Sequence, residues 1–341
     1  MNILSLTSSS SSIWDAYVAR HPDATVFHLS GWGRVMERAT GHRTHYLMAM
    51  EDGRVAGIYP LVILSSRLFG VMGVSLPFVG YGGMVSDTPE AEQALADEAA
   101  RRAVAAGCRT IELRQRRPLK LDWPTTDRKV ATAISTAGGA EQVLARLHQN
   151  VRNKIRKAAK EGITVQEGPE GLPDFYAIYS RNLRDLGTPV ISRRFFEAAL
   201  AQFPDHLKVY RAVRNDKTIA AKIVAVDRRT CYFTWSASLR EELAHAPVHA
   251  MNWRAIEDAC KAGCAWVDMG RSTAGTSHQD FKKYWGGESW TLPWAYQLLN
   301  GAELPGLHKE DRRFSLAIAL WKRMPLGLSR LLGPPIARNL P

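Results

Sequence analysis

Cysteine is scarce in this sequence, which has four cysteines among 341 residues. Cys108, Cys231, Cys260 and Cys264 are too few and too irregularly spaced to predict a disulfide framework or a zinc site. Cys260 and Cys264 stand about one helical turn apart, but no second pair of ligands accompanies them. We therefore interpret all four as small buried residues and predict no metal centre.

Long apolar runs are missing as well. No stretch approaches the roughly 18 apolar residues that a membrane-spanning helix needs. The N-terminus, MNILSLTSSSSS, has no positively charged segment and too short an apolar stretch for a secretory signal. The sequence therefore predicts a cytoplasmic protein. Its apolar content of 45%, with ten tryptophans, is ample for a core, and 341 residues is long for one domain.

Acidic residues are few relative to basic ones. The chain has 45 Lys and Arg against 33 Asp and Glu, a formal net charge of +12, with a sequence pI near 9.7. Such a surplus favours anionic partners, among them RNA, phosphorylated substrates and an acidic membrane surface. The charge alone does not choose among them.

Two stretches of the chain repeat each other. Residues 105–114 (AAGCRTIELR) and 261–270 (KAGCAWVDMG) each follow a helical pattern and contain Ala/Lys-Ala-Gly-Cys followed by an apolar strand. In both, an acidic residue stands four positions after the cysteine, as Glu112 and Asp268. Matching order in the two halves predicts duplication of one structural unit.

The segments upstream of these stretches also match. Residues 46–63 and 209–226 each predict two strands joined by a tight polar turn, and each pair follows a helical segment, at 31–40 and 193–203. Each unit is thus expected to run helix, antiparallel hairpin, further strand, helix, strand. We predict an α+β (mixed α/β) fold rather than a doubly wound one.

The region between the two units is rich in residues that break helices and strands. We place a linker at about residues 118–139. Residues 140–160 then predict one amphipathic helix. Its polar face is basic, with Arg152, Lys154, Arg156, Lys157 and Lys160. This face is interpreted either as ordinary solvated surface or as a contact for phosphates of a nucleic acid or nucleotide.

Residues 267–288 (VDMGRSTAGTSHQDFKKYWGGE) carry the most chemical information. A short apolar strand is expected to end at Asp268, and a loop of small residues leads to a basic and aromatic cluster at 281–287. Ligands in α/β folds commonly bind where a strand opens into a loop. Arg271 and Lys282 in such a loop predict a site that holds an anionic group or stabilises a developing negative charge.

The same motifs resemble the FemAB-like transferases, which consist of two tandem acetyltransferase (GNAT) type domains. The resemblance rests on Asp268-Met269-Gly270 and on the stretch from Phe281 to Gly286, supported by FHLSGWG at 27–33, the basic helix, and NLRDLGTP at 182–189. GRST with FKKYWGGE resembles most the branch associated with exosortase (PEP-CTERM) and exopolysaccharide gene clusters. The resemblance covers about residues 13–300.

The resemblance, to a family with the BioF2-like acetyltransferase domain, implies two GNAT-like domains related by internal duplication. We place domain 1 at residues 13–125, domain 2 with the active cleft at 135–300, and a basic, apolar tail at 301–341. The implied activity is transfer of an acyl or aminoacyl group to an amine. No cofactor is expected to stay bound, and acyl-CoA or aminoacyl-tRNA would be the donor co-substrate.

The resemblance also implies roles for individual residues. Lys282 is the expected cation for the oxyanion that forms when the amine attacks the carbonyl. Asp268 would orient the amine or accept its proton, or else cap the loop that follows through backbone N–H groups. Arg271 suits a carboxylate or phosphate.

Further residues are predicted to bind substrate. Arg184 stands where the family uses an arginine on substrate phosphates, and Arg34, two residues after Trp32, is a weaker candidate for the same task. An ordinary surface ion pair is the alternative for each. Lys283 could replace its neighbour as the cation. Tyr232 and Phe281 would line the cleft, whereas Trp235, on the same strand as Tyr232, is more typical of core packing. His278, at the loop centre, is only a minor candidate for catalysis.

The sequence departs from the family pattern in two ways. It has no clean Arg/Gln-x-x-Gly-x-Gly/Ala signature for binding acyl-CoA, and this absence favours aminoacyl-tRNA as the donor. It also lacks the coiled-coil arm of some family members, which leaves an inherited tRNA-binding mode in doubt. The expected acceptor is an amine of a cell-envelope or exopolysaccharide precursor. The alternatives are a catalytically silent scaffold in a polysaccharide assembly system and, last, an RNA-binding protein.

The C-terminal segment, residues 314–341, mixes Leu, Ile and Trp with basic residues and prolines. Its basic residues are Lys322, Arg323, Arg330 and Arg338. One interpretation is that it packs on the N-terminal domain. The other is an interfacial segment that brings the enzyme to a lipid-linked substrate as a peripheral contact at the inner membrane.

Overall fold

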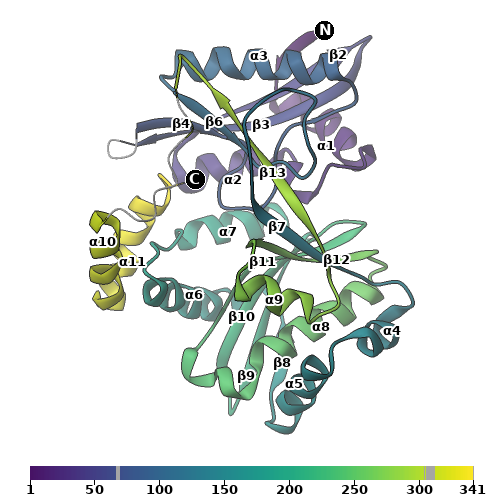
Figure 1. The fold of residues 1–341 in the computed structure, drawn as a ribbon, viewed down its shortest axis with the longest axis vertical. Coiled ribbons are helices and arrows are strands. Elements are labelled where there is room, and N and C mark those ends of the chain that lie inside the picture. The colour runs from purple at the N-terminus through teal and green to yellow at the C-terminus, as the bar shows by residue number, and fades with distance from the viewer. Residues whose placement is uncertain (67–69, 303, 305–311, 341) are drawn as a thin grey trace. The chain divides into compact units, whose positions relative to one another are not determined.

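The computed structural model describes residues 1–66, 70–302, 304 and 312–340. Parts of the predicted domain 1 (67–69) and of the predicted tail (303, 305–311 and 341) therefore lie outside the described residues. The chain divides into two units (Figure 1). Unit 1 comprises residues 1–129, 292–308 and 335–341, and unit 2 comprises residues 130–291 and 309–334.

Unit 1 is a mixed sheet with helices packed against it. Its helices are α1 (Ser11–Arg20), α2 (Gly31–Thr40) and α3 (Pro89–Ala105), with 3-10 turns at Ser8–Ser10 and Val26–His28. Its strands are β1 (Asn2–Ser5), β2 (Arg43–Glu51), β3 (Arg54–Ser66), β4 (Gly70–Val74), β5 (Val85–Ser86) and β6 (Thr110–Leu113). The strand order is β1-β2-β3-β4-β6, followed by β13 (Glu288–Leu298), and β5 pairs with β3.

Local sequence explains why these elements form. Asp52 and Gly53 both have positive φ, the geometry of the tight turn that joins β2 to β3. The Thr88 side chain accepts a hydrogen bond from the backbone of Ala91, and Pro89 follows at the first helical position, so α3 begins there. The core forms where the alanine-rich face of α3 packs on β2, β3 and β6.

Unit 2 repeats this order of elements. Its helices are α4 (Gly139–Arg146), α5 (Gln149–Lys160), α6 (Leu172–Leu186), α7 (Arg193–Gln202), α8 (Pro247–Lys261), α9 (Ser277–Lys283) and α10 (Arg312–Arg323), with 3-10 turns at Pro169–Gly171 and Arg240–His245. Its strands are β8 (Thr164–Glu167), β9 (Leu207–Arg214), β10 (Lys217–Val226), β11 (Thr230–Ser238) and β12 (Trp266–Thr273). The sheet order from β7 (Thr125–Ser135) is β7-β12-β11-β10-β9-β8.

The predicted order of helix, hairpin, third strand, helix and strand is therefore confirmed in both units. In unit 1 the hairpin β2–β3 is followed by β4, α3 and β6, and in unit 2 the hairpin β9–β10 is followed by β11, α8 and β12. The last strand of each series pairs in parallel with the third, as β6 with β4 and β12 with β11. β7 and β13 each belong partly to unit 1 and partly to unit 2.

The predicted linker contains the boundary between the two units, at residues 129 and 130, although residues 125–135 within it form the strand β7. Three local predictions were wrong. The predicted helix at 140–160 is two helices, because the extended backbone of Leu147 ends one and the ring of His148 accepts a hydrogen bond from Asn150 N at the start of the next. β12 runs through Gly270 to Thr273, and residues 277–283 form the helix α9 rather than a loop.

The C-terminal segment forms α10 and α11 (Leu326–Ala337). α10 packs on α6 of unit 2, which differs from the expectation of packing on the N-terminal domain. The end of the segment does contact unit 1, where the Arg338 carbonyl lies 2.8 Å from Nε2 of His42.

Candidate functional site

The candidate site lies where β11 and β12 stop pairing. The described pairing runs from Thr230–Trp266 to Tyr232–Asp268, although both strands continue beyond it. At Gly270 the backbone has φ +75°, and a Cβ built there would lie 2.8 Å from the carbonyl oxygen of Phe233. A side chain at 270 would therefore be strained and would collide with β11. Glycine allows the two backbones to approach at this point.

Lys282 lies on α9 with its ammonium group against this bend in β12. Nζ donates hydrogen bonds to the carbonyl oxygens of Gly270, at 2.6 Å, and Arg271, at 2.8 Å. Burial lowers the pKa of Lys282 to about 8, an effect that the charge of Asp268 opposes and that of Arg271 adds to. The ammonium group has three N–H donors, so one donor remains beyond these two bonds for a further acceptor.

Asp268 is buried, with 1% of its surface exposed, and its Oδ1 accepts a hydrogen bond of 2.6 Å from the backbone N–H of Gly270. This bond favours the alternative in which the carboxylate caps the turn that follows. Its charge also favours the protonated form of Lys282. Tyr232, its register partner on β11, is buried beside it.

Aromatic rings surround the α9 side of the site. The Phe281 ring lies 5.5 Å from the ring of His249 on α8, and the His249 ring stacks on Trp285 at 5.8 Å between centroids. Burial lowers the pKa of His249 to about 4, so this imidazole is neutral at pH 7. Among the described residues, its Nδ1 atom has no hydrogen-bond partner.

The structure brings together five of the predicted site residues, namely Lys282, Asp268, Arg271, Tyr232 and Phe281. Arg271 is exposed, and its charge also acts on Tyr179 of α6.

The remaining predicted residues lie elsewhere. Arg184, near the end of α6, forms an ion pair of 2.6 Å with Asp185 and donates to the carbonyl of Met324 in the C-terminal segment. Lys283 is exposed and faces Asp280 at 3.8 Å. Arg34 is exposed on α2 of unit 1.

Sequence reasoning missed a second lysine near the site. Lys222 on β10 has only 2% of its surface exposed, donates to Oδ1 of Asn252 on α8, and places Nζ 3.4 Å from the ring centroid of Phe233. No carboxylate of the described residues lies within ion-pair distance of it, and burial lowers its pKa to about 7, with a smaller effect from Lys282. A lysine inside the apolar run TIAAKIVAV was the signal that could have revealed it.

The equivalent position in unit 1 is filled. By the repeat, Glu112 corresponds to Asp268 and Arg114 to Gly270. Arg114 is buried, pairs with Glu112 at 3.0 Å, donates to the carbonyl of Val79 at 2.9 Å and stacks its guanidinium on Trp294. The Arg114 side chain is thus fully engaged within unit 1, whereas the corresponding residue of unit 2 is a glycine beside the ammonium group of Lys282, so unit 2 is the better candidate for the reaction.

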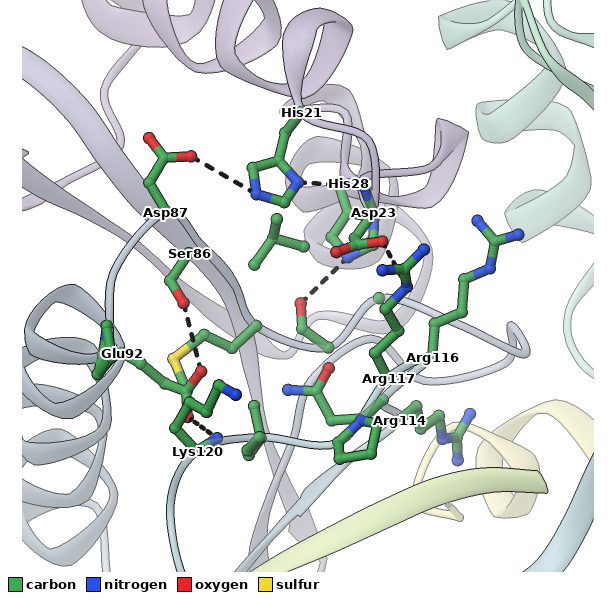
Figure 2. A pocket seen from close by; sticks show the side chains of 18 of the residues that line it. His21, Asp23, His28, Ser86, Asp87, Glu92, Arg114, Arg116, Arg117 and Lys120 are labelled. Atoms are coloured by element: carbon green, nitrogen blue, oxygen red, sulfur yellow. Dashed lines mark hydrogen bonds and ion pairs between the residues drawn. The ribbon is translucent and has the colours of Figure 1, made fainter. Parts of the chain in front are cut away.

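Unit 1 nevertheless has a pocket of about 410 Å³ between the start of α3, the segment after β6 and residues 21–28 (Figure 2). Figure 2 shows Asp23 in contact with Arg117 and Asp87 in contact with His21. Arg117 lies 2.7 Å from Asp23, and Glu92 accepts hydrogen bonds from the backbone N–H groups of Lys120 and Leu121. The carboxylates of the pocket lining are thus engaged within the protein.

The described residues contain neither a candidate metal-binding group nor a helix that could cross a membrane. No group of three or more His, Cys, Asp or Glu side chains there could hold a metal ion. In the same residues, no helix is both long and apolar enough to cross a bilayer.

A match to a known protein family lies within unit 2. Residues 145–283 match the family of the acetyltransferase (GNAT) domain, a stretch that contains β11, α8, β12 and α9 and ends at Lys283. The match confirms the prediction of a GNAT-type acyltransferase, a class whose acyl donor is acyl-CoA. None of the curated proteins matches the sequence significantly.

Solved structures share the fold over most of the chain. A crystal structure of FemX is 16% identical with a TM-score of 0.68, covering 88% of this chain and 98% of its own. The C-terminal domain of a putative lysylphosphatidylglycerol synthetase from Agrobacterium fabrum is 14% identical with a TM-score of 0.57, covering 92% and 96%. A tandem GNAT protein from the clavulanic acid biosynthesis pathway is 11% identical with a TM-score of 0.52, covering 89% and 99%. The chain thus has the predicted fold of two tandem GNAT-like domains.

Proposed function

We propose that this protein is an N-acyltransferase of the FemAB/GNAT type that transfers an acyl or aminoacyl group to an amine of a cell-envelope or exopolysaccharide precursor. The observation that carries the proposal is the half-buried ammonium group of Lys282 at the place where β11 and β12 separate. Similarity of the sequence to the exosortase-associated FemAB-like branch suggests the class of acceptor.

The chemistry requires a cation at this position. Attack of an amine on the donor carbonyl forms a carbon–nitrogen bond and places a negative charge on the carbonyl oxygen. Lys282 has two of its N–H groups fixed by the Gly270 and Arg271 carbonyls, which orient the third. A donor carbonyl that enters between β11 and β12 would receive that hydrogen bond, and the oxyanion would be stabilised before the thiol or tRNA hydroxyl leaves.

Nearby charges keep Lys282 usable for this role. Asp268 supports the protonated form, and Arg271 adds positive charge at the exposed side of the site, where it could bind a phosphate or carboxylate of a substrate. The acceptor must attack as a neutral amine, and Asp268 is already engaged by the Gly270 N–H. We therefore expect the acceptor amine to reach the site already deprotonated. The proton that its nitrogen still loses after the attack goes to the departing thiolate or tRNA oxygen.

The donor is acyl-CoA or aminoacyl-tRNA, and two features bear on the choice. The matched GNAT domain supports acyl-CoA. The missing acyl-CoA signature and the basic face of α5 support aminoacyl-tRNA, because cations such as Lys154, Arg156 and Lys157 are exposed there.

The proposal includes a peripheral contact with the cytoplasmic face of the inner membrane through the C-terminal segment. Lipid-linked precursors are at this surface, and one structural relative is named for synthesis of a lysyl lipid. Arg184 is held by this segment through the Met324 carbonyl, and Arg34 remains a candidate for substrate phosphates.

One experiment tests the proposal. The purified chain is incubated separately with acyl-CoA and with charged tRNA in the presence of amino-sugar and peptide amines, and thiol release or deacylation of the tRNA is measured. Lys282→Met should lower kcat by about 10²–10³-fold. Lys283→Met is the matched control, since it removes an exposed ammonium group from the next position. Donor binding without turnover in the wild type would instead favour a silent scaffold, and a larger loss in Lys283→Met would move the role to that residue.

A further inference from the structure

The two C-terminal helices expose leucines on the side that faces away from α6. Five leucines have between 41% and 69% of their surface exposed, at positions 316, 320, 328, 331 and 332. Leu316 and Leu320 are four residues apart on α10, and Leu328, Leu331 and Leu332 have spacings of three and four on α11. Residues so spaced share one helix face. Surface helices ordinarily point charged residues outward, so these two have the opposite pattern.

Polar contacts hold the helices in this orientation. Arg184 of α6 donates to the carbonyl of Met324 at 2.8 Å, and Arg330 of α11 donates to Oγ of Ser180 on α6 at 2.8 Å. Gly187, just past α6, leaves no room for a side chain, because a Cβ there would lie 2.5 Å from Cγ2 of Ile318. The inner faces are thus fitted to α6, and the leucines on the outer faces are left in contact with water.

The charge of this segment indicates what would cover the leucines. Residues 312–341 contain six basic residues and no acidic residue. Arg323 is exposed at the end of α10, three residues after Leu320 and on the same helix face, and Arg338 is exposed just past α11. Lys322 is also exposed, but its Cε lies beside Gly187, on the α6 side of α10. Exposed leucines flanked by cations suit the surface of a bilayer that contains anionic lipids, where apolar side chains insert and cations pair with phosphates.

We propose that the outward faces of α10 and α11 form a docking surface for an anionic lipid bilayer. This surface, defined by Leu316, Leu320, Leu328, Leu331 and Leu332 together with Arg323, is called the leucine face below. The proposal rests on the proposed function only in giving the enzyme a reason to reach a lipid-linked acceptor. The binding itself needs no acyl transfer.

A second copy of the chain is the competing occupant of an apolar surface. Two leucine faces placed together would bring two sets of basic residues close to each other without an acidic residue from the same segments to offset them. Like charges this close oppose association. The bilayer is therefore the better match.

The test uses the full chain and vesicles of phosphatidylcholine with or without 30% phosphatidylglycerol. Sedimentation should show that the protein binds the anionic vesicles and that added salt weakens this binding. Binding to the neutral vesicles should be weaker than binding to the anionic ones. The triple substitution Leu316→Gln, Leu320→Gln, Leu331→Gln should lower the affinity by more than about 100-fold. Arg323→Gln should lower it by about five-fold.

Leu243→Gln is the matched control, because Leu243 is also half exposed in unit 2 but lies outside the leucine face. It should bind anionic vesicles as the wild type does. Circular dichroism and melting of each variant would show that loss of binding does not reflect unfolding. Acyl transfer to a soluble amine should be unchanged in the triple variant, which separates this proposal from the proposed function.

The proposal is overturned if the wild type does not bind anionic vesicles, or if the triple variant binds as tightly as the wild type. A dimer of the wild type in analytical ultracentrifugation would also overturn it under two conditions. The triple substitution must abolish the dimer, and anionic vesicles must fail to dissociate it. Vesicle binding without acyl transfer to any amine would leave the surface in place and refute the proposed function instead.

Discussion

Replacing Lys222 by methionine should stabilise the protein, and more so at low pH. The amine is buried between β10 and α8, and burial lowers its pKa from 10.5 to about 7. In the unfolded chain the same amine stays protonated up to about pH 10. Below pH 7 the folded protein must bury a charge without a carboxylate, and a shift of this size corresponds to about 5 kcal/mol of lost stability. Contact of the ammonium group with the Phe233 ring offsets up to about 2 kcal/mol of this.

The sign of the pH dependence follows from proton binding. Between the folded and unfolded pKa values the unfolded chain binds more protons, so the free energy of unfolding of the wild type rises with pH. Methionine has nearly the same length and carries no charge, so Lys222→Met removes this dependence. The variant should therefore be more stable by about 3–5 kcal/mol at pH 6, and by only about 2 kcal/mol at pH 9.

Urea titrations at pH 6, 7.5 and 9 measure the effect. Lys217→Met is the control, because Lys217 lies on the same strand but is exposed, and it should change stability by less than about 0.5 kcal/mol at each pH. The reasoning is refuted if Lys222→Met is no more stable than the wild type at pH 6, or if its advantage does not shrink as the pH rises.

Three other changes have defined outcomes. The pKa of Lys282 is lowered to about 8, and the protonated form is the active one, so kcat should fall as the pH rises through about 8. A pH–rate profile measures this, and a kcat that keeps rising to pH 10 would exclude this role for Lys282. Gly270→Ala should destabilise the protein by about 1–3 kcal/mol, through its positive φ and its clash with the Phe233 carbonyl; an unchanged urea midpoint would contradict this. Arg330→Ala removes the bond to Ser180 and should increase limited proteolysis within 312–337 while the rest of the chain stays protected.

Much of the fold was predictable because it depends on local signals. The hairpins follow from alternating apolar strands joined at Asp52-Gly53 and Asn215-Asp216, residues that tolerate the positive φ they adopt. The start of α3 follows from Thr88 and Pro89. Such signals act within a few residues and do not require the rest of the protein.

Other elements depend on residues far apart in the chain. The stretch before Phe281 is rich in Gly, Ser and Thr, which favours a loop. It forms α9 because Phe281 packs on the unit 2 core and the backbone of Tyr284 accepts a hydrogen bond from His148 N. The break at His148 within the expected helix has the same origin. Tertiary contacts outweighed local propensity in both places.

The candidate site was predictable in part. The motif from Asp268 to Lys282 contains the half-buried cation of the candidate site, since residue types that carry chemistry can be read from sequence. The partners of that cation could not be read, because they are backbone carbonyls of Gly270 and Arg271. The role of Arg184 as a contact for the C-terminal segment was equally hidden.

The sequence by itself determined the duplicated order of elements, the basic charge and the segment that contains Lys282, because periodicity, composition and short motifs are properties of neighbouring residues. Only the tertiary structure decided that Gly270 lets β12 approach β11, that Arg114 is buried and paired with Glu112, that Lys222 is buried beside Phe233, and that the leucines of α10 and α11 are exposed. These depend on which strands and helices pack together, and burial and pKa are set by neighbours that the linear sequence does not specify.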